Sequence, residues 1–226
     1  MRGREEALVH DEAAYPPGPW RLRGDLLVSV LRVPPHRVAG LDAALPAGHR
    51  PLTVRGHGFV GIAMVRYAPT GMLTYDELLV AVLTHERHVP RVTIPQIWVT
   101  SPASRAGGRV LWGIPKELAS FAWAGGSQVR VEARDDDGAG IARLTARVGQ
   151  RLVPGRVAVP LPTAQRRPDA STVRAHNTVT GTLRRLAVRW DLPPEGPLGH
   201  LHGLRPIASA AVVDASIVFG RRVEES

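Results

Sequence analysis

Lys116 is the residue whose chemistry the rest of the sequence does not duplicate. It is the only lysine among 29 lysine and arginine residues. A guanidinium group stays protonated at any working pH, whereas a buried amine can lose its proton and attack a carbonyl carbon. Its sequence neighbours Trp112, Ile114 and Phe121 are apolar, and apolar surroundings disfavour the charged form of an amine. We therefore predict a Schiff-base nucleophile, although a solvated lysine without a role is the simpler interpretation of its rarity.

Glu77 is the second candidate for proton chemistry. It closes the motif Tyr75-Asp76-Glu77, which opens an apolar segment. A carboxylate at the start of a buried strand can orient a substrate or carry a proton. A turn residue that pairs with an arginine explains the same motif equally well, so the residues alone leave both interpretations open.

The histidine pairs and the aspartate run do not have the spacing of a metal site. His85 and His88 are three residues apart, whereas paired zinc ligands on one helix face are four apart. His200 and His202 are two apart in a segment rich in proline and glycine. The run Asp135–Asp137 lacks the spacing of a calcium loop and is interpreted as a solvated turn. We expect no metal site.

The segments that must position these residues are short, closely spaced and mostly β-like. Two helices are expected, one that Pro34-Pro35 opens over His36–Leu45 and a short one that Ser101 or Ser104 caps. A mainly β, β-rich α+β protein follows, built as an antiparallel barrel or sandwich. The predicted strands are Leu26–Arg32, Val60–Tyr67, Tyr75–Glu86, Ile94–Thr100, Gln128–Ala133, Ile141–Val148, Val157–Leu161, Thr178–Trp190 and Ala208–Phe219.

Composition narrows the class of protein and its partners. A net charge of +9 and an isoelectric point of about 11.2 favour acidic partners, nucleic acid among them. The arginines are scattered, however, and do not alternate with aromatic residues as a single-strand-binding surface requires. We therefore expect no nucleic-acid partner. The chain has no cysteine, which excludes disulfides and thiolate chemistry.

The apolar segments are also too short for a membrane protein. None approaches the roughly 20 residues that a transmembrane helix needs. Residues Met1–Glu6 do not lead into the apolar core of a signal peptide. We expect a cytoplasmic protein without membrane association, in which residues 1–18 form an N-terminal arm and residues 19–226 a single domain.

The segment around the lysine is more specific than the lysine alone. Gly108–Ala119 resembles the G-R-E-x-x-G-x-P-K-x-x-A segment of the acetoacetate decarboxylase family. Tyr75-Asp76-Glu77 is similar to the Y-x-E motif of that family, and the closing strand Ala208–Phe219 also fits its pattern. The resemblance covers most of the chain from about Pro19, and the proline-lysine segment is its one specific motif.

The resemblance implies a closed, cone-like antiparallel β-barrel with extra strands, one or two short helices and the active site inside. It makes Lys116 the amine that forms an imine with a keto or oxo acid, and Glu77 the acidic residue beside it. It implies a lyase, either a decarboxylase or a condensing enzyme of secondary metabolism, that needs no cofactor and assembles as a homo-oligomer. Residues expected to contact the substrate are Arg23 or Arg32 at its carboxylate, and Trp98, Trp112 and Ile114 elsewhere.

Two positions depart from the family pattern. A second lysine follows the catalytic one in the decarboxylase proper, whereas Glu117 follows it here. A second family carboxylate falls near Gly61 or Ile62, which cannot replace it. These changes leave imine chemistry intact but open the choice of substrate. The alternatives are a non-catalytic barrel that binds a small hydrophobic ligand, and a basic nucleic-acid-associated β-protein.

Overall fold

The structure is a computed structural model, and it describes residues 13–226. Within this range 14 strands form one continuous sheet. The helical segments are α1 (Pro35–Val38), η1 (Ala39–Ala44), α2 (Pro102–Trp112) and η2 (Gly199–Leu201). The strands are β1 (Trp20–Val33), β2 (His49–Pro51), β3 (Thr53–Val54), β4 (His57–Tyr67), β5 (Tyr75–Glu86), β6 (Val89–Val99), β7 (Lys116–Leu118), β8 (Ser120–Ala124), β9 (Val129–Arg134), β10 (Gly140–Arg151), β11 (Val157–Pro160), β12 (Thr163–Arg166), β13 (Thr172–Asp191) and β14 (Pro206–Glu225).

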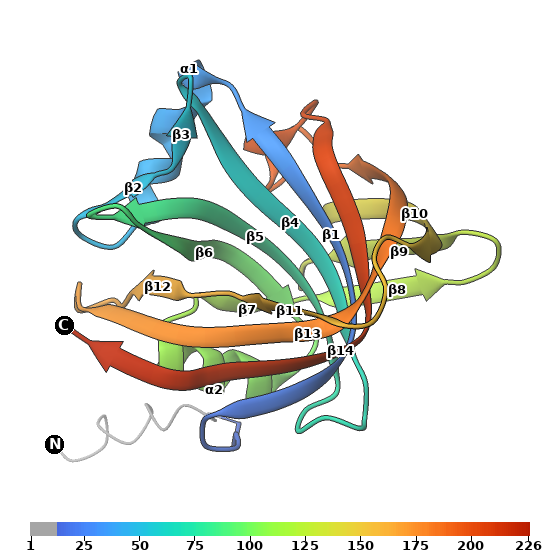
Figure 1. Cartoon of the computed structure of the whole chain (residues 1–226), viewed down its shortest axis with the longest axis horizontal. Helices are drawn as coiled ribbons and strands as arrows, with labels where there is room; N and C mark the ends of the chain where they lie inside the picture. The colour runs from blue at the N-terminus through green and yellow to red at the C-terminus, as the bar shows by residue number, and fades with distance from the viewer. Residues whose placement is uncertain (1–12) are drawn as a thin grey trace, which may run out of the picture.

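Seven of these strands close into a barrel, which confirms the predicted fold class. They follow the order β12-β6-β5-β4-β1-β14-β13, and β12 also pairs with β13 to complete the circle (Figure 1). Most pairings are antiparallel, as expected. The exceptions are β7 and β12, which each lie parallel to β6. A closed sheet has no free edge, because its first and last strands pair with each other. The closure also encloses an interior in which a site can lie.

The apolar runs predict the strands well and their lengths less well. Strand β5 has the predicted bounds, and the predicted strands Gln128–Ala133 and Ile141–Val148 correspond to β9 and β10, which pair as an antiparallel hairpin. Strands β13 and β14 have 20 residues each, more than the apolar runs within them. Their extra length is held by partners, because β13 continues past its pairing with β12 to pair with β10.

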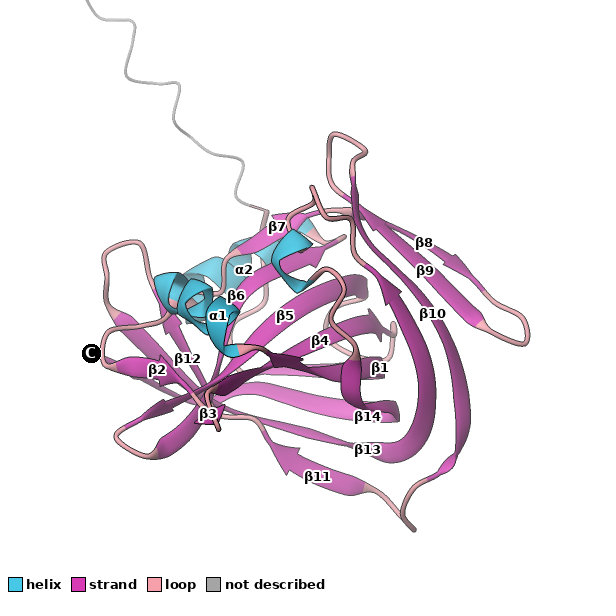
Figure 2. Ribbon diagram, turned by 90° about the horizontal axis from the view of Figure 1, so that it is seen from above, coloured by secondary structure: helices cyan, strands magenta, loops and turns pink. Residues whose placement is uncertain are grey.

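The alternation of side chains along each strand separates two apolar regions. On β4, Ala63 and Val65 face the barrel interior, whereas Ile62 and Met64 face outward. The outward face packs against β8, β9 and β10, which curl over the barrel as a second layer (Figure 2). The main core therefore lies between the two layers, and the barrel interior is separate from it.

The two expected helices are present, with differences in form. The segment predicted as a helix over His36–Leu45 is split into α1 and the 3₁₀ helix η1. Helix α2 begins as predicted at a serine cap, where the Ser101 Oγ accepts a hydrogen bond from the Ser104 N–H at 3.1 Å. No helix within residues 13–226 has the length and apolarity needed to cross a membrane.

The chain before β1 packs against the barrel where the structure describes it. The Trp20 indole N–H donates to the Pro16 carbonyl oxygen at 2.8 Å, and Tyr15 is partly buried in the same apolar cluster. Within the predicted arm over residues 1–18, Tyr15 and Pro16 therefore lie against the domain, and the first twelve residues lie outside the described range.

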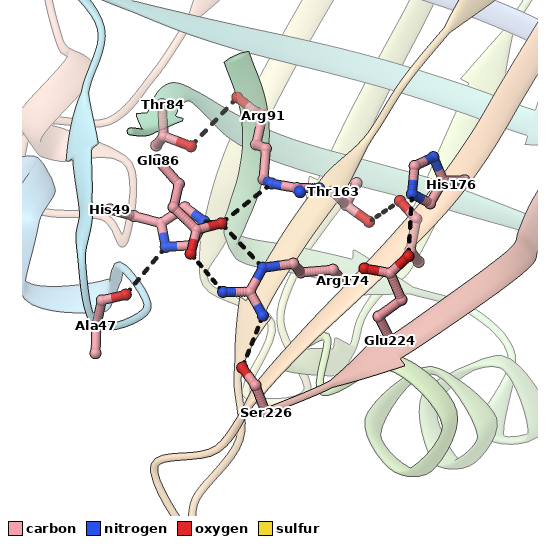
Figure 3. A network of polar contacts seen from close by, with 11 residues as sticks. Ala47, His49, Thr84, Glu86, Arg91, Thr163, Arg174, His176, Glu224 and Ser226 are labelled. Carbon is pink, nitrogen blue, oxygen red and sulfur yellow. Dashed lines mark hydrogen bonds and ion pairs between the residues drawn. The ribbon is translucent and has the colours of Figure 1, made fainter. Parts of the chain in front are cut away.

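A polar cluster ties four strands together at the end of β5 that is remote from Glu77 (Figure 3). The Glu86 carboxylate accepts two hydrogen bonds from Arg174 of β13, at 2.9 and 2.5 Å. It also lies 3.5 Å from Arg91 of β6 and 3.6 Å from His49 of β2. The hydrogen bonds from Arg174 lower the pKa of Glu86, so the carboxylate stays ionised at neutral pH. Within residues 13–226, no three potential ligands gather to hold a metal ion.

Candidate active site

Lys116 enters the barrel because helix α2 ends abruptly before it. Gly113 caps the helix in the left-handed conformation, with φ of 66°, which glycine adopts without steric cost. The chain then turns back into β7, where Lys116 pairs in register with Ile97 of β6. The lysine side chain points into the barrel and is only 4% exposed.

Three polar groups surround the amine of Lys116. The Nζ atom lies 2.8 Å from the Glu77 Oε2 atom and 2.9 Å from the Ser104 Oγ atom. The Tyr75 hydroxyl is 3.5 Å away. Glu77 is 3% exposed, and its Oε1 atom accepts a hydrogen bond from the Tyr67 hydroxyl at 3.1 Å. The two residues singled out from the sequence, from segments 39 positions apart, are thus in direct contact.

The two tyrosines, Tyr67 and Tyr75, stay neutral and therefore act only as hydrogen-bond donors or acceptors. Burial raises the pKa of Tyr67 and of Tyr75 well above the ordinary value of 10.0, and the nearby charge of Glu77 raises both further. Both hydroxyls therefore keep their protons at any physiological pH. The Tyr67 hydroxyl can donate to Glu77 throughout this range and hold the carboxylate in place.

The amine and the carboxylate lie at one end of a cavity of about 440 Å³ inside the barrel. Trp112 forms part of the cavity wall, and its ring makes T-shaped contacts with the rings of Trp20 and Phe219, with centroids 4.7 Å apart in each pair. Ile114 lines the cavity beside it. The structure therefore places the predicted contacts Trp112 and Ile114 in the same cavity as Lys116 and Glu77.

Three other predicted substrate contacts do not line this cavity, and their assignment is corrected. Trp98 is directly opposite Leu78 in the sheet, and opposed residues share a face, so both belong to the outer core. Arg23 is exposed and lines a separate surface hollow with Arg66. Arg32 is also exposed, close to the end of β1, and is not part of the cavity wall.

The residue after the lysine faces away from the site. Side chains alternate along β7, so Glu117 points outward, where its carboxylate lies 2.5 Å from the Arg109 guanidinium. Its charge is neutralised at the surface and does not enter the cavity. At the position of the missing family carboxylate, Gly61 lines the cavity and Ile62 lies in the outer core.

Sequence reasoning missed two of the polar residues around Lys116 and Glu77, namely Tyr67 and Ser104. Tyr67 joins the site because it pairs in register with Tyr75 on the neighbouring strand, a relation visible only in the sheet. Ser104 was considered as a helix cap, whereas its side chain contacts Lys116. It lies one helical turn before Gly108, on the helix face that Lys116 crosses, and this i, i+4 spacing was the available signal.

Comparisons with known proteins agree with this fold. The sequence matches the family described as "Acetoacetate decarboxylase (ADC)" over residues 9–215. A search of curated proteins finds no significant match. The crystal structure of acetoacetate decarboxylase from Legionella pneumophila subsp. pneumophila str. Philadelphia 1 has a TM-score of 0.72 and 18% identity, covering 95% of this chain and 89% of that one.

Two further solved structures share the fold. The enduracididine biosynthesis enzyme MppR, in complex with pyruvate, has a TM-score of 0.65 at 16% identity and covers 95% of this chain and 93% of its own. An acetoacetate decarboxylase-like enzyme from Sphingomonas wittichii RW1 has a TM-score of 0.63 at 17% identity, with coverages of 88% and 89%. Since the family match extends over nearly the whole sequence, this protein belongs to the acetoacetate decarboxylase family.

Proposed function

We propose that the protein is a lyase that binds a keto or oxo acid as an imine on Lys116. The observation that carries this proposal is the contact between the only lysine and the Glu77 carboxylate, at 2.8 Å, at one end of an apolar cavity. Membership in a family of enzymes supports it. MppR, which shares the fold, has been crystallised with pyruvate and with a condensation product of pyruvate and an aldehyde.

The contact supplies a way to make the amine nucleophilic. Transfer of one proton from Nζ to the Glu77 carboxylate gives a neutral amine and a neutral acid. Apolar surroundings favour this neutral pair relative to the ion pair. The amine then attacks the substrate carbonyl carbon, and the carbonyl oxygen takes up protons and leaves as water. The product is an imine, and one further proton on its nitrogen makes it an electron sink.

A 3-oxo acid bound in this way can lose carbon dioxide. The bond between the α-carbon and the carboxylate breaks, and its electron pair moves toward the protonated imine nitrogen to give an enamine. A proton then adds to the α-carbon, and water hydrolyses the imine to release a ketone and the free amine. The same enamine can instead attack an aldehyde, so the residues fit both decarboxylation and condensation.

The orientation of Lys116 distinguishes this proposal from a ligand carrier of the same fold. A barrel that only binds a hydrophobic ligand gains nothing from an ion pair in its wall. Removing the two charged groups from water costs on the order of several kcal/mol for each ion. Here both charged groups face the cavity. This arrangement favours an enzyme. A cytoplasmic location and a homo-oligomeric state stay predictions.

Trapping with borohydride tests the imine directly. The protein is incubated with acetoacetate, pyruvate and other 2-oxo and 3-oxo acids, reduced, and weighed by intact mass spectrometry. We expect one adduct per chain with at least one of these acids, located at Lys116 by peptide mapping. Mapping also separates Lys116 from the N-terminal amine, the other primary amine of the chain. Absence of a Lys116 adduct with every acid would contradict the proposal.

Gly108→Ala is expected to slow imine formation without harming the fold. A Cβ atom at this position would lie 2.7 Å from Lys116 Cδ and 2.9 Å from Cε, so the lysine chain must move and carry its amine away from Glu77. A displacement near 1 Å at a reacting group costs roughly 100-fold in rate. The measurement is the rate of borohydride trapping, with thermal unfolding as the check on stability. Gly40→Ala, where a Cβ has nothing within 4 Å, is the matched control.

A further inference from the structure

The cavity extends far beyond the group that would react. On β5 the side chains of Glu77, Leu79, Ala81 and Leu83 all face it, because they alternate along one strand. At about 3.3 Å per residue, this row is roughly 20 Å long. A bound acetoacetate molecule would occupy only the first part of such a length.

The lining of this extension is apolar throughout. Among the described residues that line the cavity, the only charged side chains are Lys116 and Glu77, and the only hydroxyls are those of Tyr67 and Tyr75. All four lie together at the end of the cavity where Lys116 contacts Glu77. The remaining lining residues carry aliphatic or aromatic side chains or are glycine. A second carboxylate or another polar group of a ligand would find no partner there.

The extension is also not filled by the protein itself. Closed barrels of about eight strands are usually filled by their own side chains. Here, small residues face one another across β4 and β5, where Gly61 pairs with Ala81. Inward-facing Leu26, Val28 and Leu79 are only partly buried. Apolar surface left open within a barrel is the feature that an apolar ligand would cover.

We propose that the substrate of this site is a keto compound with a long aliphatic tail. The proposal rests on the imine function above and adds the substrate class to it. The carbonyl carbon lies at Lys116, and any carboxylate stays beside it among the polar residues around Lys116. The tail runs along β5 past Ala81. With carbon–carbon bonds of about 1.5 Å in a zigzag, the space holds a chain of roughly ten carbons or more.

A chain-length series tests this substrate class by the same trapping reaction. The probes are acetoacetate and the methyl ketones acetone, 2-hexanone, 2-octanone, 2-decanone and 2-dodecanone. We expect the ketone concentration that gives half-maximal trapping to fall two- to four-fold for each added methylene, and about four-fold corresponds to ~0.8 kcal/mol. Equal concentrations across the series, with acetoacetate still trapped, would overturn the proposed tail and leave the imine function standing.

A blocking variant tests where the tail lies. Ala81→Leu places a larger side chain in the extension, about 13 Å along the strand from Glu77 at ~3.3 Å per residue. We expect it to trap acetoacetate and the ketones up to 2-octanone as the wild type does and to lose the gain from 2-decanone onward. Ala158→Leu, an exposed position that does not line the cavity, is the matched control and should keep the gain. If Ala81→Leu also keeps the full gain, the tail does not run along β5 and the proposal fails.

A binding measurement removes the imine from the test. Secondary alcohols, 2-butanol to 2-dodecanol, have the shape of the ketones but cannot react with an amine. Calorimetric titration should show Kd falling with chain length in the wild type and not in Ala81→Leu. Length-dependent alcohol binding without any trapped ketone would support the tail site and reject the imine function. No length dependence for either series would reject the tail site.

Discussion

Lys116→Arg is expected to abolish covalent trapping and to reduce turnover by a factor on the order of 10⁴ or more, as loss of a catalytic nucleophile does. Arginine retains the positive charge beside Glu77 but cannot form an imine, because its guanidinium group does not deprotonate. The measurements are intact mass after borohydride reduction and the initial rate on the best-trapped acid. Undiminished turnover in Lys116→Arg would assign the lysine a structural role.

Loss of activity is informative only if the variant folds. The space beside Lys116 is narrow, since Gly108 lies directly under its aliphatic chain, and arginine is larger. A second variant, Lys116→Met combined with Glu77→Gln, keeps the volume and removes both buried charges together. Replacing both members of a buried ion pair avoids the unpaired charge that costs about 3–5 kcal/mol when one member is lost. This double variant should unfold near the wild-type temperature and trap nothing.

Glu77→Gln alone is expected to slow trapping by about 10²- to 10³-fold, within the range found for loss of a general acid or base. An amide has nearly the same shape as the carboxylate but cannot accept the proton from the Lys116 amine. The lysine remains able to form an imine, so prolonged incubation should still give the adduct. This slow but complete trapping distinguishes Glu77→Gln from the lysine variants.

Two companion variants separate the role of the Glu77 proton from other effects. Asp76→Asn makes the same chemical change one residue away, on the opposite face of β5, where Asp76 lies 3.6 Å from Arg66. It should trap at the wild-type rate. Tyr67→Phe removes one hydrogen bond to Glu77 and should cost about 10- to 150-fold, because a single hydrogen bond to a charged group is worth about 1.5–3 kcal/mol. Equal rates for Glu77→Gln and Asp76→Asn would contradict a proton-transfer role.

The strands of this protein were predictable wherever one segment carried its own signal. The β-branched and apolar run of β5 is a local feature, and its predicted bounds agree with the structure. The long ends of β13 and β14 were not predictable, because their hydrogen bonds go to partners distant in sequence. The parallel strands β7 and β12 are three and four residues long, too short for any periodicity.

The residues of the candidate site also differ in whether a local sequence signal predicted them. Lys116 and Glu77 were predictable because each lies in a short motif with a distinctive residue type. The direction of other side chains depended on strand register. One example is the register shift in the pairing of β5 with β6, which lies between Val80 and Val82 of β5. It lets Ile94 and Ile97, three apart, both face the cavity, and no simple alternation anticipates this. Trp98, an even number of residues after Ile94, faces the outer core for this reason.

The sequence by itself determined the chemistry available, which is one amine and one carboxylate in apolar segments, and the mainly β class. Those properties belong to residue types and short-range patterns. Only the tertiary structure decided that the two groups meet at 2.8 Å, that Glu117 points away from them, and that an apolar space continues past Ala81. Each of these depends on which strands pair and in which register, because a shift by one residue turns every side chain of a strand to the other face.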